Sequence, residues 1–401
     1  MRRFAPAALI LALSLPTAAS AIVAPNPETR PPERAGERPA FAGQTRAPTT
    51  PSDVRYQVET VARGLNHPWG LAFLPDGRML VTERPGRLRL IARSAVSPPI
   101  AGMPKVVTGD AQLGLYGLAL SPGYARDHTI FFAYSEPAPG GSRLAVARAR
   151  LDEAAGKASL ADLKVIFRAE PVRSGGANIG GRVVFAPDGT LFVTVGDRFE
   201  SMDLAQRLDN DLGKVVRIAA DGSIPKDNPF VGRAGARPEI YSYGERNGEA
   251  AAINPADHKL WVVEHGARGG DEVNVIAPGK NYGWPVITYG IDYSGALIGQ
   301  GITQKAGMEQ PIYYWDPVIA PSGMAFYTAG LFPAWKGSLF VGGLKGERVS
   351  RLALSGERVT GEEWLFRELH ERIRDVVQGP DGALYLLTDD GKGRVLKVVP
   401  K

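Results

Sequence analysis

The sequence predicts an all-β fold, a six-bladed β-propeller of four-stranded antiparallel blades, and three observations support it. The 401 residues include 48 Gly and 32 Pro, too many for a helical protein and typical of a chain punctuated by turns. Six stretches repeat one pattern: a short apolar strand, a turn on Pro-Asp-Gly or a near equivalent, and a β-branched or aromatic strand. The copies are irregularly spaced, as expected when each is the inner hairpin of one blade and variable loops lie at one end of the blades. A β-sandwich or a two-domain β protein is the alternative.

The six copies follow one another along most of the chain. They are WGLAFLPDGRMLVTER (Trp69–Arg84), LYGLALSPGYARDHTIFFAYSE (Leu115–Glu136), GRVVFAPDGTLFVTVGD (Gly181–Asp197), AAAINPADHKLWVVEHG (Ala250–Gly266), GMAFYTAGLFPAWKGSLFVGGL (Gly323–Leu344) and VVQGPDGALYLLTDD (Val376–Asp390). Because a repeat of this kind forms one closed ring, we expect a single propeller domain over residues 56–401.

The first 55 residues do not belong to this pattern. Residues 1–21 contain Arg2 and Arg3, an apolar run and the small-residue triplet Ala19–Ser20–Ala21, which predicts a secretory signal peptide cleaved after Ala21. The apolar run is shorter than the ~20 residues that span a bilayer, so we expect a periplasmic or secreted protein without a membrane span. Residues 22–55 are rich in Pro, Thr, Ala and Arg without apolar periodicity, which predicts a disordered linker.

The charge balance excludes one class of partner. The formal net charge is +5, or +5 − 2 = +3 without the two arginines of the signal segment, and no long Lys/Arg run is present. We therefore expect no nucleic-acid binding. The chain has no Cys, so no disulfide contributes to its stability.

The stretch EHGARGGDEVNVIAPGKNYGWP, Glu264–Pro285, is a candidate cation-binding loop. Its glycines allow the backbone to turn carbonyl oxygens inward, where a hard cation could bind them. Asp271 and Glu272 add negative charge to the same segment. A glycine-rich surface loop with a solvated acidic pair is the alternative.

Four basic residues are candidates for binding an anion. Arg372 and Arg374 are two apart on an expected strand, so their guanidinium groups point the same way. With Lys345 and Arg246 they could surround a polyanionic ligand, because all four follow or precede the repeated strands at the same end. Ordinary surface charge, paired with Glu371 or Asp375, is the alternative.

Eight motifs occur here in the order seen in one protein family. They are LNHPWGLAFLPDGRMLVTER, GRVVFAPDGTLFVTVGD, DGSIPKDNPF, PEIYSYGERN, EHGARGGDEVN, GKNYGWP, APSG and RIRDVVQGPDGALYLLTD. Through them the chain resembles, from Val58 to Val399, the soluble glucose/sorbosone dehydrogenases, the pyrroloquinoline-quinone (PQQ)-dependent aldose sugar dehydrogenases, which are six-bladed propellers. The resemblance implies PQQ- and Ca²⁺-dependent oxidation of an aldose, or a related alcohol, at its anomeric carbon to the lactone. Hydride would pass to the quinone, and an external electron acceptor would reoxidise it.

The resemblance also implies roles for individual residues. The carbonyls of Gly266 and Ala267 would bind a Ca²⁺ that also contacts the quinone. The tricarboxylate cofactor would be surrounded by cations and hydrogen-bond donors, namely Gln112, Arg246, Asn247, Lys345, Arg372 and Arg374. A second, structural Ca²⁺ would be bound by oxygen ligands from Glu272, the Tyr282 carbonyl, Asp292 and Glu309.

The chain departs from the family pattern where the chemistry takes place. The family has a His, the general base, at the position of Asn178, and an amide cannot accept a proton near neutral pH. Asp197, which in the family would orient that His, could act as the base, beside Arg246 in the active site. Glu245, in the altered stretch Gly244–Ala250, could have taken over instead. The third possibility is a propeller that binds PQQ, sugar or protein without turnover, and a Ca²⁺-dependent lactonase is a further alternative.

Overall fold

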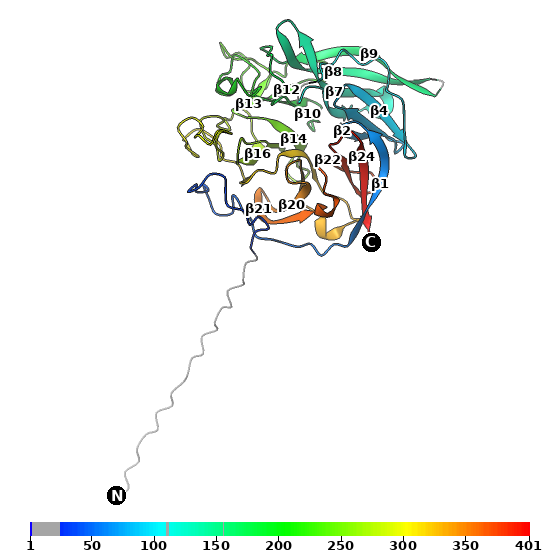
Figure 1. The fold of residues 1–401 in the computed structure, drawn as a ribbon. Coiled ribbons are helices and arrows are strands. Elements are labelled where there is room, and N and C mark those ends of the chain that lie inside the picture. Colours follow the sequence, from blue (N-terminus) through cyan, green and yellow to red (C-terminus); the bar gives the residue numbers. More distant parts are fainter. Residues whose placement is uncertain (2–24, 110–111, 155) are drawn as a thin grey trace.

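The computed structural model describes Met1 and residues 25–109, 112–154 and 156–401. Its strands form six separate four-stranded antiparallel sheets, arranged around one axis as a disc (Figure 1). The described helices are single short turns, α1 (Tyr124–Asp127) and three 3-10 turns, η1 (Met202–Gln206), η2 (Pro333–Trp335) and η3 (Arg367–Leu369). The predicted all-β, six-bladed propeller is confirmed. The predicted signal peptide lies almost entirely outside the described residues.

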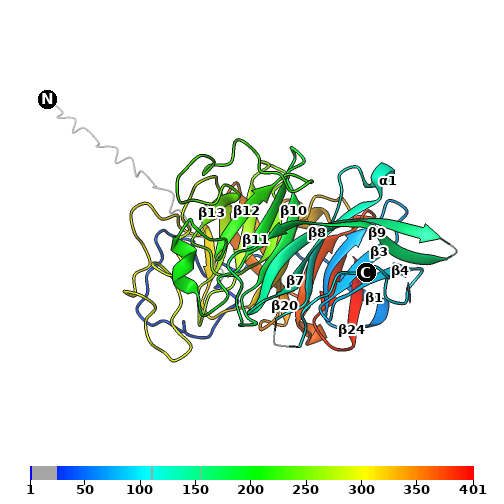
Figure 2. The ribbon, with the colours of Figure 1, turned by 90° about the horizontal axis from the view of Figure 1, so that it is seen from above.

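Each blade runs from an inner strand at the axis to an outer strand at the rim. Blade 1 contains β2 (Pro68–Phe73), β3 (Met79–Glu83), β4 (Arg87–Ala92) and β5 (Ala95–Val96). Blade 2 contains β6 (Leu115–Leu120), β7 (Thr129–Ala138), β8 (Gly141–Ala154) and β9 (Lys157–Arg168). Blade 3 contains β10 (Gly180–Phe185), β11 (Leu191–Val195), β12 (Lys214–Ile218) and β13 (Ile240–Tyr243). The hairpin of β8 and β9 projects beyond the other blades, as Figure 2 shows from above.

The second half of the ring repeats this order. Blade 4 contains β14 (Gly248–Ile253), β15 (Leu260–Glu264), β16 (Asp271–Ile276) and β17 (Tyr313–Trp315). Blade 5 contains β18 (Pro321–Phe326), β19 (Leu339–Gly343), β20 (Arg348–Ser355) and β21 (Arg358–Leu365). Blade 6 contains β22 (Ile373–Gln378), β23 (Leu384–Thr388) and β24 (Gly393–Pro400), and its outer strand is β1 (Tyr56–Leu65) from the start of the domain.

The pairing of β1 with β24 closes the ring. The two strands are antiparallel, with Tyr56 opposite Pro400 and Leu65 opposite Gly393. Because the first and last strands share one sheet, the ring cannot open without breaking this ladder of hydrogen bonds, which fixes the relative positions of all six inner strands.

The six repeated stretches are the inner hairpins of the blades, as predicted. In the first copy β2 and β3 pair antiparallel, and the turn closes with Gly77 at φ +83°, where a residue with a side chain would be strained. The second strand of each hairpin in blades 1, 3, 4, 5 and 6 is buried along its whole length. Each of these strands begins with at least three consecutive apolar residues.

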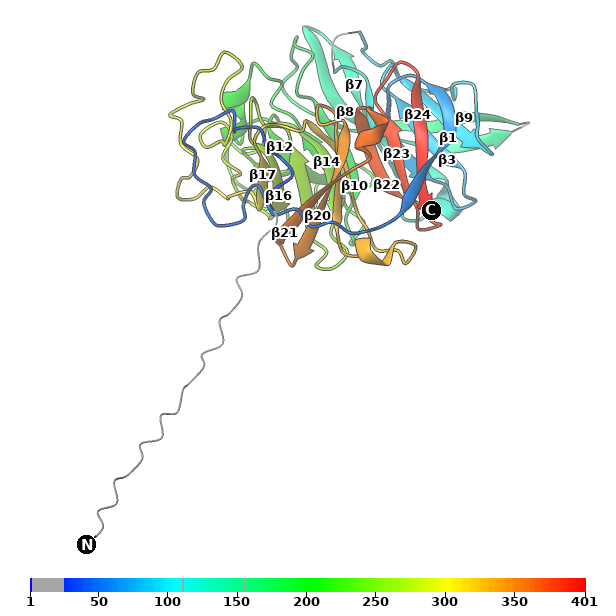
Figure 3. The ribbon, with the colours of Figure 1, turned by 60° about the horizontal axis from the view of Figure 1, so that its bottom comes forward.

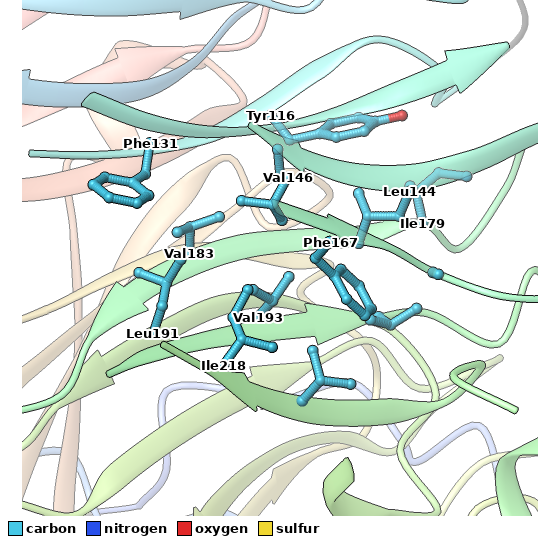
Figure 4. Packing of buried hydrophobic residues seen from close by; sticks show 14 of the residues in the cluster. Tyr116, Phe131, Leu144, Val146, Phe167, Ile179, Val183, Leu191, Val193 and Ile218 are labelled. Atoms are coloured by element: carbon cyan, nitrogen blue, oxygen red, sulfur yellow. The ribbon is translucent and has the colours of Figure 1, made fainter. Parts of the chain in front are cut away.

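Apolar side chains fill all six interfaces between neighbouring blades. Figure 4 shows the interface of blades 2 and 3, where Phe131 and Val146 of one blade meet Val183 and Val193 of the next. Separate clusters occupy the other five interfaces. Burial of both faces of each sheet is the main source of the propeller's stability.

The prediction of a disordered linker before the propeller is wrong for residues 25–55. This N-terminal strap runs along the outer strands of blades 4 and 5 (Figure 3), with Thr45 bridging Tyr314 of β17 and Thr49 bridging Glu362 of β21. Arg34 donates to the carbonyls of Thr288 (2.8 Å) and Gly301 (2.5 Å). The segment is ordered by partners from the rest of the chain, and it covers two edge strands that would otherwise expose unpaired backbone groups.

Candidate active site

The candidate site lies at one end of the central channel. The channel itself contains a cavity of about 380 Å³, which is lined by all six inner strands and extends to Pro255 and Thr328, after β14 and β18, so it opens toward the opposite end. The pair formed by Arg182 and Asp375 (3.3 Å) lies on its wall, and Arg182 also donates to the Glu249 carbonyl (2.9 Å). In an antiparallel hairpin the inner strand begins where the second strand ends, so the loops before the first and after the second converge. We call this end of the disc the mouth.

Asp197, directly after β11, is the centre of the hydrogen bonding at the mouth. Its carboxylate is fully buried and accepts from the side-chain amide of Asn178 (2.9 Å), the indole of Trp284 (2.8 Å) and the backbone N–H of Phe199 (2.7 Å). Its own backbone N–H donates to the carbonyl of Arg246 (2.9 Å). Three donors on one carboxylate fix its orientation.

Arg246 connects this centre to the glycine loop. Its Nη1 donates to the carbonyl of Gly266 (2.5 Å), and its guanidinium lies 5.2 Å from the ring centroid of Trp284. Its Nη2 is 3.5 Å from the hydroxyl of Tyr293, and its buried Nε has no partner among the described residues. Arg246 therefore joins the centre at Asp197 to the Gly266 carbonyl.

Two of the predicted cations converge through a shared carboxylate. Arg374 and Arg372 both reach Oδ2 of Asp389, at 2.8 and 3.5 Å. Arg374 also pairs with buried Glu249, which lies 3.4 Å from Nε2 of His265, the residue before Gly266. These contacts therefore link Asp389 to the glycine loop.

These ion pairs set the charge states of the two acids. Burial alone raises the pKa of Glu249, but the charges of Arg374 and His265 lower it to about 2. Burial likewise raises the pKa of Asp389, yet Arg374 and the hydrogen bond to His67 hold it well below its ordinary value. Both carboxylates are ionised at neutral pH and keep Arg374 in place.

The remaining predicted cofactor residues border the same mouth. Lys345, directly after β19, is exposed and has no ion pair in the described part of the chain, and its neighbour Leu344 lies 3.4 Å from Nη1 of Arg372. The side chain of Gln112 accepts the N–H of Asn178 (2.6 Å), and that of Asn247 accepts the N–H of Gly180 (2.8 Å). Gln112 and Asn247 thus hold the backbone on either side of Asn178.

A pocket of about 190 Å³ opens beside Asp197. Its charged lining residues are Asp197, Glu200, Arg246 and Asp292, and the others are Phe199, Met202, Ala267, Trp284, Tyr293 and Ile298. Nothing in the motif GKNYGWP indicated that Trp284 would be a partner of Asp197. Sequence reasoning also missed the two exposed aromatic rings, Phe199 and Tyr293, because nothing in the spacing relates residues 94 positions apart.

Glu245, one alternative for the base, does not line this pocket. Its carboxyl accepts from the hydroxyl of Ser242 (2.5 Å) and is fully buried, and burial together with the nearby charge of Glu264 raises its pKa. A carboxyl in the interior of blades 3 and 4 cannot reach a ligand in the pocket.

The predicted second calcium set is not formed. Glu309 pairs with Lys280 (2.8 Å), Asp292 accepts from its own turn at Ser294 (2.8 Å), and Glu272 is hydrogen-bonded to Asn274. Across the described ranges, no three carboxylate or imidazole side chains gather closely enough to hold a metal ion.

The first predicted calcium ligands do lie at the mouth. The carbonyl of Gly266 points to Arg246, and a Cβ at this position would meet Gly269 O at 2.2 Å, so only glycine fits. Ala267 is buried with Ala205, Trp284 and Ile298. A carbonyl oxygen has two lone pairs, so the hydrogen bond from Arg246 leaves one for a cation.

Fold and site define a β-propeller whose small pocket, with a buried carboxylate and a buried guanidinium, lies at one end of the channel beside further cations. The chain belongs to the Glucose / Sorbosone dehydrogenase family, whose model matches residues 65–397. It is 44% identical over 348 residues to aldose sugar dehydrogenase YliI of Escherichia coli strain K12, covering 86% of this chain and 93% of that protein.

Solved structures agree with this assignment. The apo form of the soluble aldose sugar dehydrogenase of E. coli is 43% identical, with a TM-score of 0.83, over 86% of this chain and 100% of that chain. The PQQ-bound aldose sugar dehydrogenase of Streptomyces coelicolor is 30% identical, with a TM-score of 0.70, over 87% of this chain and 99% of that chain. No helix in the described ranges has the length and apolarity needed to cross a bilayer.

Proposed function

We propose that this chain is a PQQ-dependent oxidoreductase that oxidises an aldose at its anomeric carbon to the lactone. The observation that carries the proposal is the unbroken set of contacts from Asp389 through Arg374, Glu249 and His265 to the Gly266 carbonyl, directly beside the pocket that contains Asp197. Family membership and the PQQ-bound relative support it.

The donors at the mouth fit a cofactor with three carboxylates. Lys345 and half-exposed Arg372 offer positive charge, and Arg246 and Arg374 each have a buried Nε without a partner. Arg246, Lys345, Arg372 and Arg374 would bind the carboxylates and carbonyls of PQQ, with Gln112 and Asn247 beside them. PQQ, when bound, would supply a two-electron acceptor for the hydride of the sugar.

The carbonyls of Gly266 and Ala267 would bind a Ca²⁺ beside the quinone. The tight glycine turn supports this, because it directs the Gly266 carbonyl to Arg246 at the pocket, and Ala267 lines the same pocket. We do not extend the proposal to a second calcium ion.

Asp197 would take the proton of the anomeric hydroxyl, through a water molecule beside Asn178. Asp197 is the only acid among the pocket-lining residues that also contacts Arg246 and Trp284, whereas Asn178 can only donate to it or orient a water. Arg246 would hold the sugar oxygen and balance the charge that develops there.

The experiment is a calorimetric titration of PQQ into protein with and without Ca²⁺, followed by dye reduction with a panel of aldoses. We expect tight, Ca²⁺-dependent PQQ binding and aldose-dependent reduction of the dye. Binding of PQQ without reduction by any aldose would favour the non-catalytic alternative, for which the amide at Asn178 is the supporting observation. Lactone hydrolysis with metal alone would favour the lactonase.

The expected place of action is the periplasm or the exterior of the cell, where an external carrier would reoxidise the cofactor. The N-terminal segment supports this part of the proposal. Mass spectrometry of the mature protein tests it, since cleavage after Ala21 gives a defined N-terminus at Ile22.

A further inference from the structure

Exposed apolar side chains gather around the candidate pocket. Ten large hydrophobic residues are exposed in the described part of the chain, and three of them, Phe199, Met202 and Tyr293, line this one pocket. A fourth, Leu297, precedes the lining residue Ile298. Concentrated exposed apolar surface around a cavity is typical of a ligand site.

The backbone presents Phe199 to solvent in an unfavourable conformation. Arg198 and Phe199 have φ of +61° and +63°, a region that residues with bulky side chains rarely adopt. The turn is fixed by the buried Arg198 guanidinium, which donates to the carbonyl (3.0 Å) and hydroxyl (3.2 Å) of Ser142, and by the Phe199 N–H bound to Asp197. Backbone strain that the surroundings enforce is concentrated at functional sites.

Tyr293 faces Phe199 from a separate turn. Its turn is held by the Asp292 N–H bound to the Ala296 carbonyl (2.9 Å). The two ring centroids are 6.1 Å apart, and the side chains are 46% and 58% exposed. The Tyr293 hydroxyl lies 3.5 Å from Arg246, so the aromatic pair extends from the rim to the polar floor of the pocket.

The pocket itself is small. Its volume of about 190 Å³ is below the roughly 300–1,000 Å³ of common ligand sites, so it would enclose one sugar ring. A sugar ring has hydroxyls at its edge and a face made largely of C–H groups, which packs against aromatic rings. The polar floor suits the reacting ring, and the aromatic rim suits a second ring.

We propose that Phe199 and Tyr293 form a subsite for the sugar ring linked to the one that reacts, so that the preferred substrates are reducing disaccharides or longer chains. This inference rests on the proposed function, because it assigns the floor of the pocket to the reacting ring. Phe199 and Tyr293 are then the residues that determine specificity.

The test is calorimetric binding of methyl glucoside, methyl maltoside and methyl cellobioside, which cannot be oxidised because their anomeric oxygen is blocked. We expect at least one disaccharide to bind tenfold or more tightly than methyl glucoside. Phe199→Asn, which removes the ring but tolerates the left-handed backbone, should weaken disaccharide binding about tenfold and at least fivefold more than monosaccharide binding. Tyr293→Phe should retain the preference, because it keeps the ring.

Phe41→Asn is the matched control, since Phe41 is 43% exposed but lies on the N-terminal strap outside the pocket, and it should change no binding constant. Equal weakening for mono- and disaccharides in Phe199→Asn, or no disaccharide preference in the unmodified protein, would overturn the subsite. A Phe199→Asn protein in which only the KM for the electron acceptor rises would also overturn the subsite. Selective glycoside binding without oxidation of maltose or cellobiose would instead refute the proposed function and leave the subsite standing.

Discussion

The side-chain amide of Asn178 donates to Oδ1 of Asp197 over 2.9 Å, and both side chains are buried beside the pocket. Asn178 has a φ of +50°, in the left-handed region where Asn, Asp and His are the side chains most often found. The resemblance implies a His oriented by an Asp at these two positions. This chain has Asn178 and Asp197 there, and an amide cannot act as a base.

Asn178→His should therefore create an imidazole base oriented by Asp197. We expect kcat with an aldose to rise by about 10²–10⁴-fold, the usual contribution of a positioned base. The measurement is steady-state dye reduction with saturating PQQ and Ca²⁺, together with a pH profile. The profile should acquire a new pKa in the range where His titrates.

Asn178→Gln is the control, because it alters the side-chain length without adding a base, and it should not raise kcat. Unchanged kcat in Asn178→His would mean that this site no longer has the geometry for proton transfer. The non-catalytic alternative would then be preferred.

The sequence predicted the parts of the fold that depend on local pattern. Turns between apolar strands, such as Asp76–Gly77, mark a hairpin through short-range physics, and six of them, three with Pro-Asp-Gly and three with near equivalents, indicated the ring. The order of the N-terminal strap was not predictable in this way, since Arg34 finds its partners at Thr288 and Gly301, more than 250 residues away. Composition describes a segment alone and not what it packs against.

The site was predictable where residues adjoin the ends of strands. Arg372, Arg374 and Lys345 were placed at one end by their position next to β22 and β19, and the structure places them there. The second calcium set failed because spacing within a loop does not fix side-chain direction, and Glu309 turns to Lys280 instead. The Ca²⁺ and PQQ roles of the other residues stay predictions.

Glu249→Gln should lower stability at neutral pH and much less in acid. The folded-state pKa of about 2 is below the ordinary 4.5, so the ionised form stabilises the fold above pH 4.5, and this contribution is lost as the pH falls toward 2. This pKa difference corresponds to a contribution to the free energy of unfolding of about 3 kcal/mol at pH 7 and about 1.4 kcal/mol at pH 3. Urea unfolding at both values of pH measures it.

The same substitution at an exposed ion pair serves as the control for Glu249. Glu371 pairs with Arg394 and its side chain is 27% exposed, so Glu371→Gln should cost less than about 1 kcal/mol. If Glu249→Gln lowered the free energy of unfolding by the same amount at both values of pH, the low pKa of Glu249 would be contradicted. Only a packing effect would then remain.

Arg34→Ala should loosen the loop of residues 286–302 that borders the pocket. The variant loses two charge-assisted hydrogen bonds to carbonyls of that loop, which together stabilise the fold by about 2–3 kcal/mol. Hydrogen exchange should accelerate over the loop, and the Tm should fall. The side chain of Arg30 is 54% exposed and binds only Glu28 among the described residues, so Arg30→Ala should leave both unchanged. If the loop were equally protected from hydrogen exchange in Arg34→Ala and Arg30→Ala, the strap would not be what holds it.

Lys345→Ala should weaken PQQ binding in a salt-dependent way. Lys345 follows β19 at the mouth, is exposed, and has no ion pair in the described part of the chain, so its charge is available to a carboxylate of the cofactor. We expect the Kd to rise about tenfold at low salt, or ~1.4 kcal/mol. At 1 M salt the difference should shrink, because the Debye length falls to about 3 Å.

Lys336 is the matched control for Lys345. It is also exposed, but it precedes the same strand, about 17 Å away at the opposite end. Lys336→Ala should therefore leave the Kd unchanged. If both variants weaken binding equally, the attraction comes from the net charge of the whole molecule and not from a cationic site at the mouth.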